Sequence, residues 1–240
     1  MSGVDVKLCR PFRVAKRGHT DDECQDAYAI DVANGRFAVA DGATESADSG
    51  LWAALLVEAF EHGGPDPWQE WLAPVQRDWA DAVRVPDDAA LPWFLERRYR
   101  DGAFSTLLGV WFKGEHWKGI AVGDTCLFHV RDNKLKASYP IERSSDFDST
   151  PWLIGSRSPA GDVPEPQSFA GSLRPGDQLL MMTDALSCWF LASAEQDREP
   201  WLALEGLARQ SDEAFAEWIN LLRDRRELKN DDTTLVAIYL

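Results

Sequence analysis

Residues 36–61 read RFAVADGATESADSGLWAALLVEAFE. The apolar run 37–40 predicts a buried strand, and Asp41-Gly42 follows it directly. A Ser/Thr/Asp-rich loop then leads to a predicted helix over about residues 50–62, whose apolar stripe is Leu51, Leu55, Leu56 and Ala59. A carboxylate and a glycine between a strand and a helix either border a site or form a plain turn, and this stretch alone leaves both interpretations open.

The segment before this stretch predicts a β-hairpin. The strand-like residues AYAIDV (27–32) precede Asn34-Gly35, a dipeptide typical of two-residue hairpin turns. Antiparallel pairing about that turn brings Asp26, at the start of the first strand, near Asp41, at the end of the second. Two carboxylates are therefore expected at one edge of the sheet.

Outside the hairpin, strand and helix patterns come in blocks. They predict an edge strand at 4–14, helices at 67–83 and 88–100, a meander of short strands at 104–140, strands at 167–173 and 178–183, helices near 186–195, 199–209 and 212–226, and a last strand at 233–240. Residues 142–167 are irregular and predict either a recognition flap or a disordered surface loop. These blocks favour an α+β fold with antiparallel sheets, and no linker divides residues 1–240, so we expect one domain.

Composition narrows the functional classes. The 240 residues carry a formal net charge of −15 at pH 7, whereas nucleic acids and anionic membranes both require a basic surface. The four cysteines contain no C-x-x-C pair, which favours free thiols in a reducing compartment. Neither a signal-peptide core nor an apolar run of about 18 residues is present. We therefore expect a cytoplasmic protein without nucleic-acid or membrane partners.

Aspartates recur at the ends of predicted strands. Asp41 follows FAVA, Asp124 follows IAVG, Asp184 follows LLMMT, and Asp231 precedes the last strand. Together with Asp26 they would gather at one sheet edge, where like charges raise one another's pKa unless a cation compensates them. An all-oxygen donor set favours Mg²⁺ or Mn²⁺, and the histidines lack zinc-ligand spacing.

Six segments resemble, in order, the PP2C (PPM) family of metal-dependent protein serine/threonine phosphatases: QDAYAI, FAVADGATE, FSTLLGV, GIAVGDTCLFHV, LLMMTDAL and NDDTTLVAI. Asp-Gly-Ala-Thr-Glu after the strand is similar to the small bacterial PP2C-like domain. The resemblance implies a four-layer α-β-β-α sandwich of two antiparallel sheets flanked by helices. It also implies two Mn²⁺ or Mg²⁺ ions at one end, with a weak third ion in some members.

The resemblance places the principal metal ligands at four matched positions. Asp41 would bridge the two metals, and the Gly42 carbonyl would bind one of them. Asp184 and Asp231 would share the first metal. Asp41, Asp184 and Asp231 would thus carry catalysis through a metal-bound water that attacks phosphorus in line.

Two further aspartates match weaker positions of the family pattern. Asp26 would act through a metal-bound water, and Asp124 matches the aspartate that helps the third metal site in some members. The glutamate that usually precedes Asp26 is Gln25 here, which is a weaker partner for the water shell of a metal.

The phosphate-binding side of the site departs further from the family. Its usual arginine falls on Asp21, and Ala43 replaces a histidine that acts as general acid in many eukaryotic members. Arg17 is the candidate replacement for the arginine, with Lys16 and Arg13 as alternatives. Substrate binding is therefore less well defined by the sequence than metal binding.

The resemblance implies hydrolysis of phosphoserine and phosphothreonine on proteins by a PP2C-type phosphatase. We expect a monomer that acts on phosphoproteins and is paired with a Ser/Thr kinase. Two alternatives stay open: a phosphatase of a small phosphate ester, or a catalytically weak regulatory or binding module with the same fold.

Overall fold

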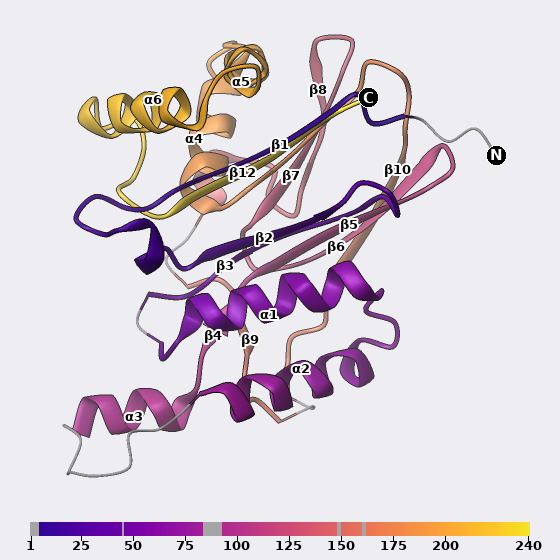
Figure 1. The fold of residues 1–240 in the computed structure, drawn as a ribbon. Helices are drawn as coiled ribbons and strands as arrows, with labels where there is room; N and C mark the ends of the chain where they lie inside the picture. The colour runs from indigo at the N-terminus through magenta and orange to yellow at the C-terminus, as the bar shows by residue number, and fades with distance from the viewer. Residues whose placement is uncertain (1–4, 45, 84–92, 148–149, 160–161) are drawn as a thin grey trace.

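The computed structural model describes residues 5–44, 46–83, 93–147, 150–159 and 162–240. Within these residues, two five-stranded antiparallel sheets stack on each other and helices cover both outer faces (Figure 1). The predicted α-β-β-α sandwich is thereby confirmed. No helix in the described ranges is both long and apolar enough to cross a membrane.

The first sheet contains the last strand of the chain near its centre. Its order is β1 (Leu8–Val14), β12 (Thr233–Tyr239), β11 (Gln178–Met182), β7 (Cys126–Arg131) and β8 (Lys134–Tyr139). Every residue of β12 is buried, because neighbouring strands flank it on both sides and each of its faces meets another layer. The outer layer consists of α4 (Asp184–Ala194), α5 (Pro200–Ala208) and α6 (Asp212–Asp224).

The second sheet carries the predicted hairpin. Its order is β10 (Gln167–Ser172), β6 (His116–Val122), β5 (Leu107–Lys113), β3 (Arg36–Asp41) and β2 (Asp26–Asp31). Helix α1 (Ser49–His62) packs on β2 and β3, α2 (Trp68–Ala82) packs on α1, and α3 (Trp93–Asp101) follows. Short elements complete the fold: β4 (Phe104–Ser105) paired with β9 (Ile154–Gly155), and the 3₁₀ turns η1 (Asp21–Glu23) and η2 (Ser144–Asp146).

Strand β3 shows why residues 37–40 form a continuous apolar run. Phe37 and Val39 belong to the core between the two sheets, whereas Ala38 and Ala40 belong to the core under α1. Both faces of the strand are buried, so its sequence does not alternate with polar residues. Asp41 is the last residue of this strand, so it lies where the strand leaves the core at the end of the sandwich.

Two details of the sequence prediction are wrong. The β2–β3 connection is the four-residue segment 32–35 rather than a two-residue turn, and Asp31 pairs with Arg36. Helix α1 buries the row Trp52, Ala53, Leu56, Val57 and Phe60, while Leu51 remains 38% exposed. The predicted and the observed buried rows are only one residue apart on a helix that is apolar on several sides. The observed row is the one that contains the large aromatic side chains, and these pack into the core.

The predicted meander over residues 104–140 is divided between the two sheets. Strands β5 and β6 pair in the second sheet, and β7 and β8 pair in the first. The chain passes from one sheet to the other at residues 123–125. This crossing places Asp124 at the end of the sandwich, between the two layers.

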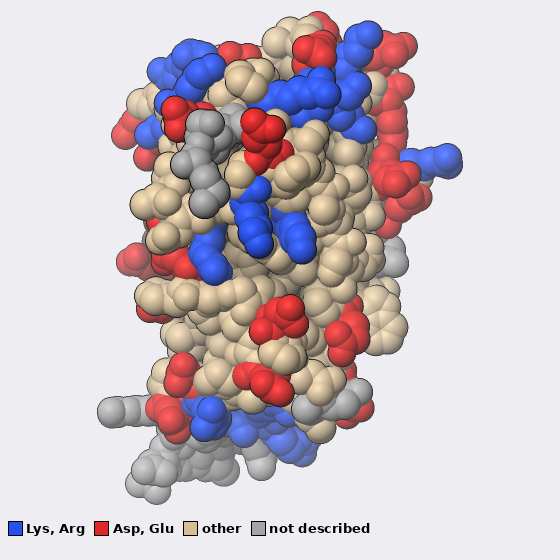
Figure 2. Space-filling view, turned by 90° about the vertical axis from the view of Figure 1, so that its right-hand side faces the viewer, with Lys and Arg blue, Asp and Glu red and all other residues tan. Residues whose placement is uncertain are grey.

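The ends of the sandwich differ in character. Figure 2 shows the end with the C-terminal residue Leu240, where one group of basic side chains lies in the middle of the face and further basic and acidic side chains lie above and below it. The start of β2 and the end of β3 lie at the opposite end. The strand ends that carry the predicted site aspartates are therefore remote from the face that Figure 2 shows.

Candidate metal centre

Asp26 and Asp41 are direct partners across the β2–β3 pair. The predicted approach of the two carboxylates is confirmed, although the turn that produces it differs. Asp26 is only 2% exposed. Both side chains therefore lie at one sheet edge, in surroundings that penalise their ionised forms.

A buried hydroxyl connects Asp26 to the other sheet. Thr183 Oγ1 donates to Asp26 Oδ2 over 3.0 Å and accepts from the Thr234 N–H over 3.0 Å. Asp26 Oδ1 is buried without a hydrogen-bond partner among the described residues. Burial, followed by the charges of Asp232 and Asp184, raises the pKa of Asp26 to about 8. A buried oxygen of this kind suits a water molecule held by a metal ion.

Asp41 is fixed through its backbone. Its N–H donates to Thr106 Oγ1 over 2.9 Å, and its carbonyl accepts from the Ser105 hydroxyl over 2.8 Å. The side chain has a pKa raised well above its ordinary value, first by burial and then by four neighbouring carboxylates, namely Asp26, Asp184, Asp124 and Asp231. The predicted aspartates thus act electrostatically on one central residue.

Gly42 leaves no space for a side chain. A Cβ built on it would lie 2.7 Å from the Ser49 carbonyl oxygen and 2.8 Å from the Gln25 carbonyl oxygen. The Gly42 N–H donates to Gln25 O over 3.2 Å, which ties the segment after β3 to the start of β2. The backbone passes close to the aspartates because residue 42 is glycine.

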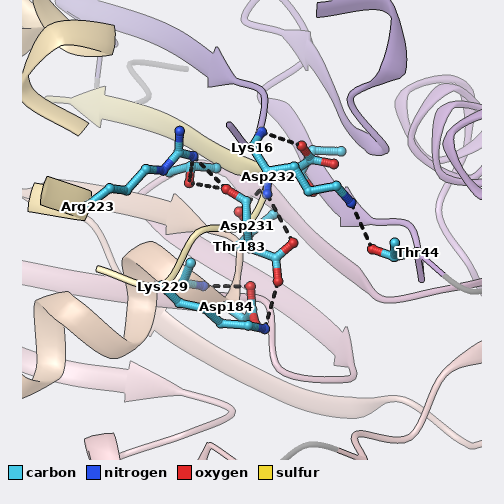
Figure 3. Close-up of polar contacts among 11 residues, drawn as sticks. Lys16, Thr44, Thr183, Asp184, Arg223, Lys229, Asp231 and Asp232 are labelled. Atoms are coloured by element: carbon cyan, nitrogen blue, oxygen red, sulfur yellow. Dashed lines mark hydrogen bonds and ion pairs between the residues drawn. The ribbon is translucent and has the colours of Figure 1, made fainter. Parts of the chain in front are cut away.

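Asp184 and Asp231 come from the other sheet. Asp184 begins α4, and its Oδ1 accepts from the Ala185 N–H over 2.6 Å. Asp231 lies just before β12. Burial raises the pKa of Asp184, while Lys229 opposes that increase and Asp231 adds to it. Lys229 contacts both carboxylates (Figure 3).

Asp124 lies at the crossing between the sheets and is 8% exposed. The hydroxyls of Thr106 and Thr125 are 2.6 Å apart, so the residue after Asp124 is joined to the residue that holds the Asp41 backbone. Asp124 also borders a groove of about 420 Å³. The structure thereby brings Asp124 to the edge of the cluster.

Two residues that sequence reasoning missed organise the loops around the cluster. Asp232 accepts from the backbone N–H of Lys16 over 2.8 Å and of Gln25 over 3.0 Å. Buried Arg223 donates to the carbonyls of Asp231 over 2.6 Å and Ala15 over 3.0 Å (Figure 3). The sequence signal for Asp232 is the pair of adjacent aspartates at 231–232. Arg223 has no such signal, because it resembles any other charged residue on an amphipathic helix.

The donor set fits hard divalent cations, since it consists of carboxylates and the Gly42 carbonyl. However, among the described residues, no three acidic, histidine or cysteine side chains are already arranged to hold one ion. The aspartate side chains lie near one another, and Lys229 contacts two of them, Asp184 and Asp231. The chemistry of the site fits Mn²⁺ or Mg²⁺, while binding requires some side chains to move.

The predicted phosphate-binding residue Arg17 has partners outside the cluster. Its guanidinium pairs with Asp224 over 2.7 Å and donates to Asn220 O over 2.8 Å, which directs it toward α6. Lys16 instead reaches the loop after β3, and its Nζ donates to Thr44 Oγ1 over 3.1 Å (Figure 3). Asp21 is exposed in η1. Lys16 is thus the better-placed cation of the two.

Comparisons with known proteins agree with this architecture. The family model described as "Protein phosphatase 2C" matches residues 15–235. No curated protein sequence matches the chain.

Solved structures share the fold at low sequence identity. The catalytic domain of the serine/threonine phosphatase PstP in complex with two manganese ions is 18% identical, with a TM-score of 0.61, over 97% of this chain and 99% of that one. The phosphatase Stp1 from Staphylococcus aureus is 14% identical, with a TM-score of 0.63, over 99% and 96%. MsPP from Mycobacterium smegmatis, in complex with cacodylate, is 17% identical, with a TM-score of 0.59, over 99% and 100%.

Proposed function

Because the chain belongs to the protein phosphatase 2C family, we propose that it hydrolyses phosphoserine and phosphothreonine on proteins with two Mn²⁺ or Mg²⁺ ions at its aspartate cluster. The predicted assignment to PP2C-type phosphatases is confirmed by the family match. The observation that carries the proposal is geometric: Asp26 pairs with Asp41, Thr183 joins Asp26 to the strand end that precedes Asp184, and one lysine contacts both Asp184 and Asp231. Such a concentration of charge costs stability unless cations compensate it.

Each aspartate has a role that follows from its place. Asp41 lies at the end of β3, beside Asp26, and would bridge the ions together with the Gly42 carbonyl that follows it. Asp184 and Asp231 would hold the first ion, and Asp26 would orient water through its free Oδ1. When bound, the ions would supply an activated water and neutralise the phosphoryl oxygens. Asp124 is the candidate for a weak third position.

A protein substrate is supported by the groove beside Asp124. It is open, and its walls include the acidic side chains of Asp146 and Glu165 together with Trp152, which is 79% exposed. A phosphorylated peptide with basic and apolar flanks would complement this lining. The expected counterpart is then a kinase that phosphorylates the same proteins. The enzyme is proposed to act as a monomer.

The phosphate is proposed to meet Lys16 rather than Arg17. The Lys16 ammonium is bonded to Thr44, three residues beyond Asp41, whereas Arg17 is engaged by Asp224. A flexible lysine provides a weaker and less directional phosphate contact than an arginine. The affinity for substrate is therefore expected to be low.

The test is phosphate release in Mn²⁺ from a phosphothreonine peptide with basic flanks, compared with an aryl phosphate. We expect turnover of both, a higher kcat/KM for the peptide, and a loss on the order of a hundredfold in Asp41→Asn. Preference for the aryl phosphate would favour a small-ester phosphatase. Turnover no higher than that of Asp41→Asn would favour a catalytically weak module, which Asp21 and Gln25 also suggest.

A further inference from the structure

One basic side chain lies inside the acidic cluster. Lys229 Nζ is 2.7 Å from Asp231 Oδ2 and 3.3 Å from Asp184 Oδ2, so a single ammonium group contacts both carboxylates (Figure 3). The side chain of Lys229 is 65% exposed, whereas Asp184 and Asp231 are 20% and 26% exposed. The lysine therefore reaches into the cluster from the solvent side.

These two carboxylates are the proposed ligands of the first metal ion. An ammonium group and a divalent cation are attracted to the same carboxylate oxygens, and each repels the other. Contact of one Nζ with an oxygen of both aspartates leaves little access for an ion that must bind both. The lack of a ready three-residue metal shell among the described residues agrees with this arrangement.

We propose that Lys229 is a resident counter-ion of the first metal position, which lowers the affinity for divalent ions because its ammonium group has to leave when an ion binds. This inference rests on the proposed function, since it takes Asp184 and Asp231 as metal ligands. The lysine stabilises the metal-free cluster, and its long exposed side chain can withdraw into solvent without moving the backbone. Only divalent concentrations high enough to displace it would then load the site.

The experiment is calorimetric titration of the full chain with Mn²⁺. Lys229→Met keeps the side-chain length and removes the charge, so we expect binding roughly fivefold to tenfold tighter than in the wild type. Lys229→Arg keeps a cation between the carboxylates and should retain wild-type or weaker affinity.

Two control variants separate direct contact from a general change in charge. Arg17→Met removes a charge from the loop after β1, where Arg17 pairs with Asp224 rather than with an aspartate of the cluster. Lys113→Met removes one at the exposed β5–β6 turn, at the opposite end of β5. Each should change Mn²⁺ affinity less than about twofold. An equal effect in Arg17→Met and Lys229→Met would overturn the proposal.

Thermal unfolding gives a second, independent readout. In a chelator, Lys229→Met should melt at a lower temperature than the wild type, because two carboxylates lose their counter-ion. In saturating Mn²⁺ the difference should vanish or reverse. A variant that is equally stable without metal, or that binds Mn²⁺ no more tightly, contradicts the inference.

The outcomes also distinguish this inference from the proposed function. If the wild type binds Mn²⁺ and Lys229→Met binds it equally or more weakly, the counter-ion role is wrong and the metal centre stands. If neither protein binds Mn²⁺, both proposals fail. Binding by Lys229→Met alone would support the counter-ion role and show that the native chain is not loaded under those conditions.

Discussion

Asp26 and Asp41 face each other across a single pair of antiparallel strands, and Thr183 from the other sheet donates to Asp26 over 3.0 Å. The cluster is therefore assembled at the contact between the two sheets rather than within one of them. Its geometry depends on the stacking of the sandwich as much as on the aspartates themselves.

Thr183→Val should destabilise the chain by about 1–3 kcal/mol, since it leaves buried Asp26 Oδ2 and the Thr234 N–H without their shared partner. Thr183→Ser keeps the hydroxyl and is the matched control. Urea unfolding of the metal-free proteins measures the difference. Equal stability of the valine and serine variants would show that the hydroxyl does not hold the sheets together.

Gly42→Ala should cost about 1–3 kcal/mol, because its Cβ would be forced against the carbonyl oxygens of Ser49 and Gln25. Gly64→Ala is the control, as a Cβ there meets no atom within 4 Å. The variant should also bind Mn²⁺ more weakly, since relief of the contact moves the Gly42 carbonyl. Wild-type stability and affinity would mean that the backbone tolerates a side chain at this position.

Arg223→Met should weaken Mn²⁺ binding on the order of tenfold, because Arg223 fixes the carbonyl of Asp231 without itself being a ligand. Arg225→Met, an exposed neighbour on the same segment, should have no effect. Calorimetry on both variants, with circular dichroism to confirm folding, provides the comparison. If a folded Arg223→Met protein binds Mn²⁺ with unchanged affinity, Arg223 does not position Asp231 for metal binding.

In the metal-free protein, stability should fall as pH rises. The pKa of Asp26 is raised to about 8, so between an ordinary carboxyl pKa of about 4 and that value the folded state binds more protons than the unfolded state. The stabilisation is complete below about pH 4 and is lost as the pH approaches 8. Melting temperatures at about pH 6 and about pH 8 measure the effect, and Asp26→Asn should reduce it. A melting temperature that rises over this interval would contradict the assignment.

Much of the fold followed from local sequence, because β3, β12 and the late helices each carry an unambiguous pattern. The division of residues 104–140 between two sheets did not, since β6 and β7 have the same apolar character in either sheet. The buried face of α1 was also missed, because its apolar residues occupy adjacent rows.

The aspartates of the site could be named because each ends or precedes a strand. Their supports could not be predicted, since Arg223 contacts Ala15 and Lys229 contacts Asp184. These pairs lie far apart in the sequence and meet only when β1, β11 and β12 pair in one sheet. The sequence predicted Arg17 as the phosphate-binding residue. Its pairing with Asp224 could not be predicted, because that contact depends on the position of α6 beside the loop after β1.

The most direct test of the central claim is the stoichiometry of Mn²⁺ binding to the wild-type chain and to Asp41→Asn. If Asp41 bridges two ions, titration calorimetry should give two ions per wild-type chain and at most one weakly bound ion in the variant. An absence of Mn²⁺ binding to the wild type, or the same binding by Asp41→Asn, would contradict the account of this cluster as a dinuclear metal centre.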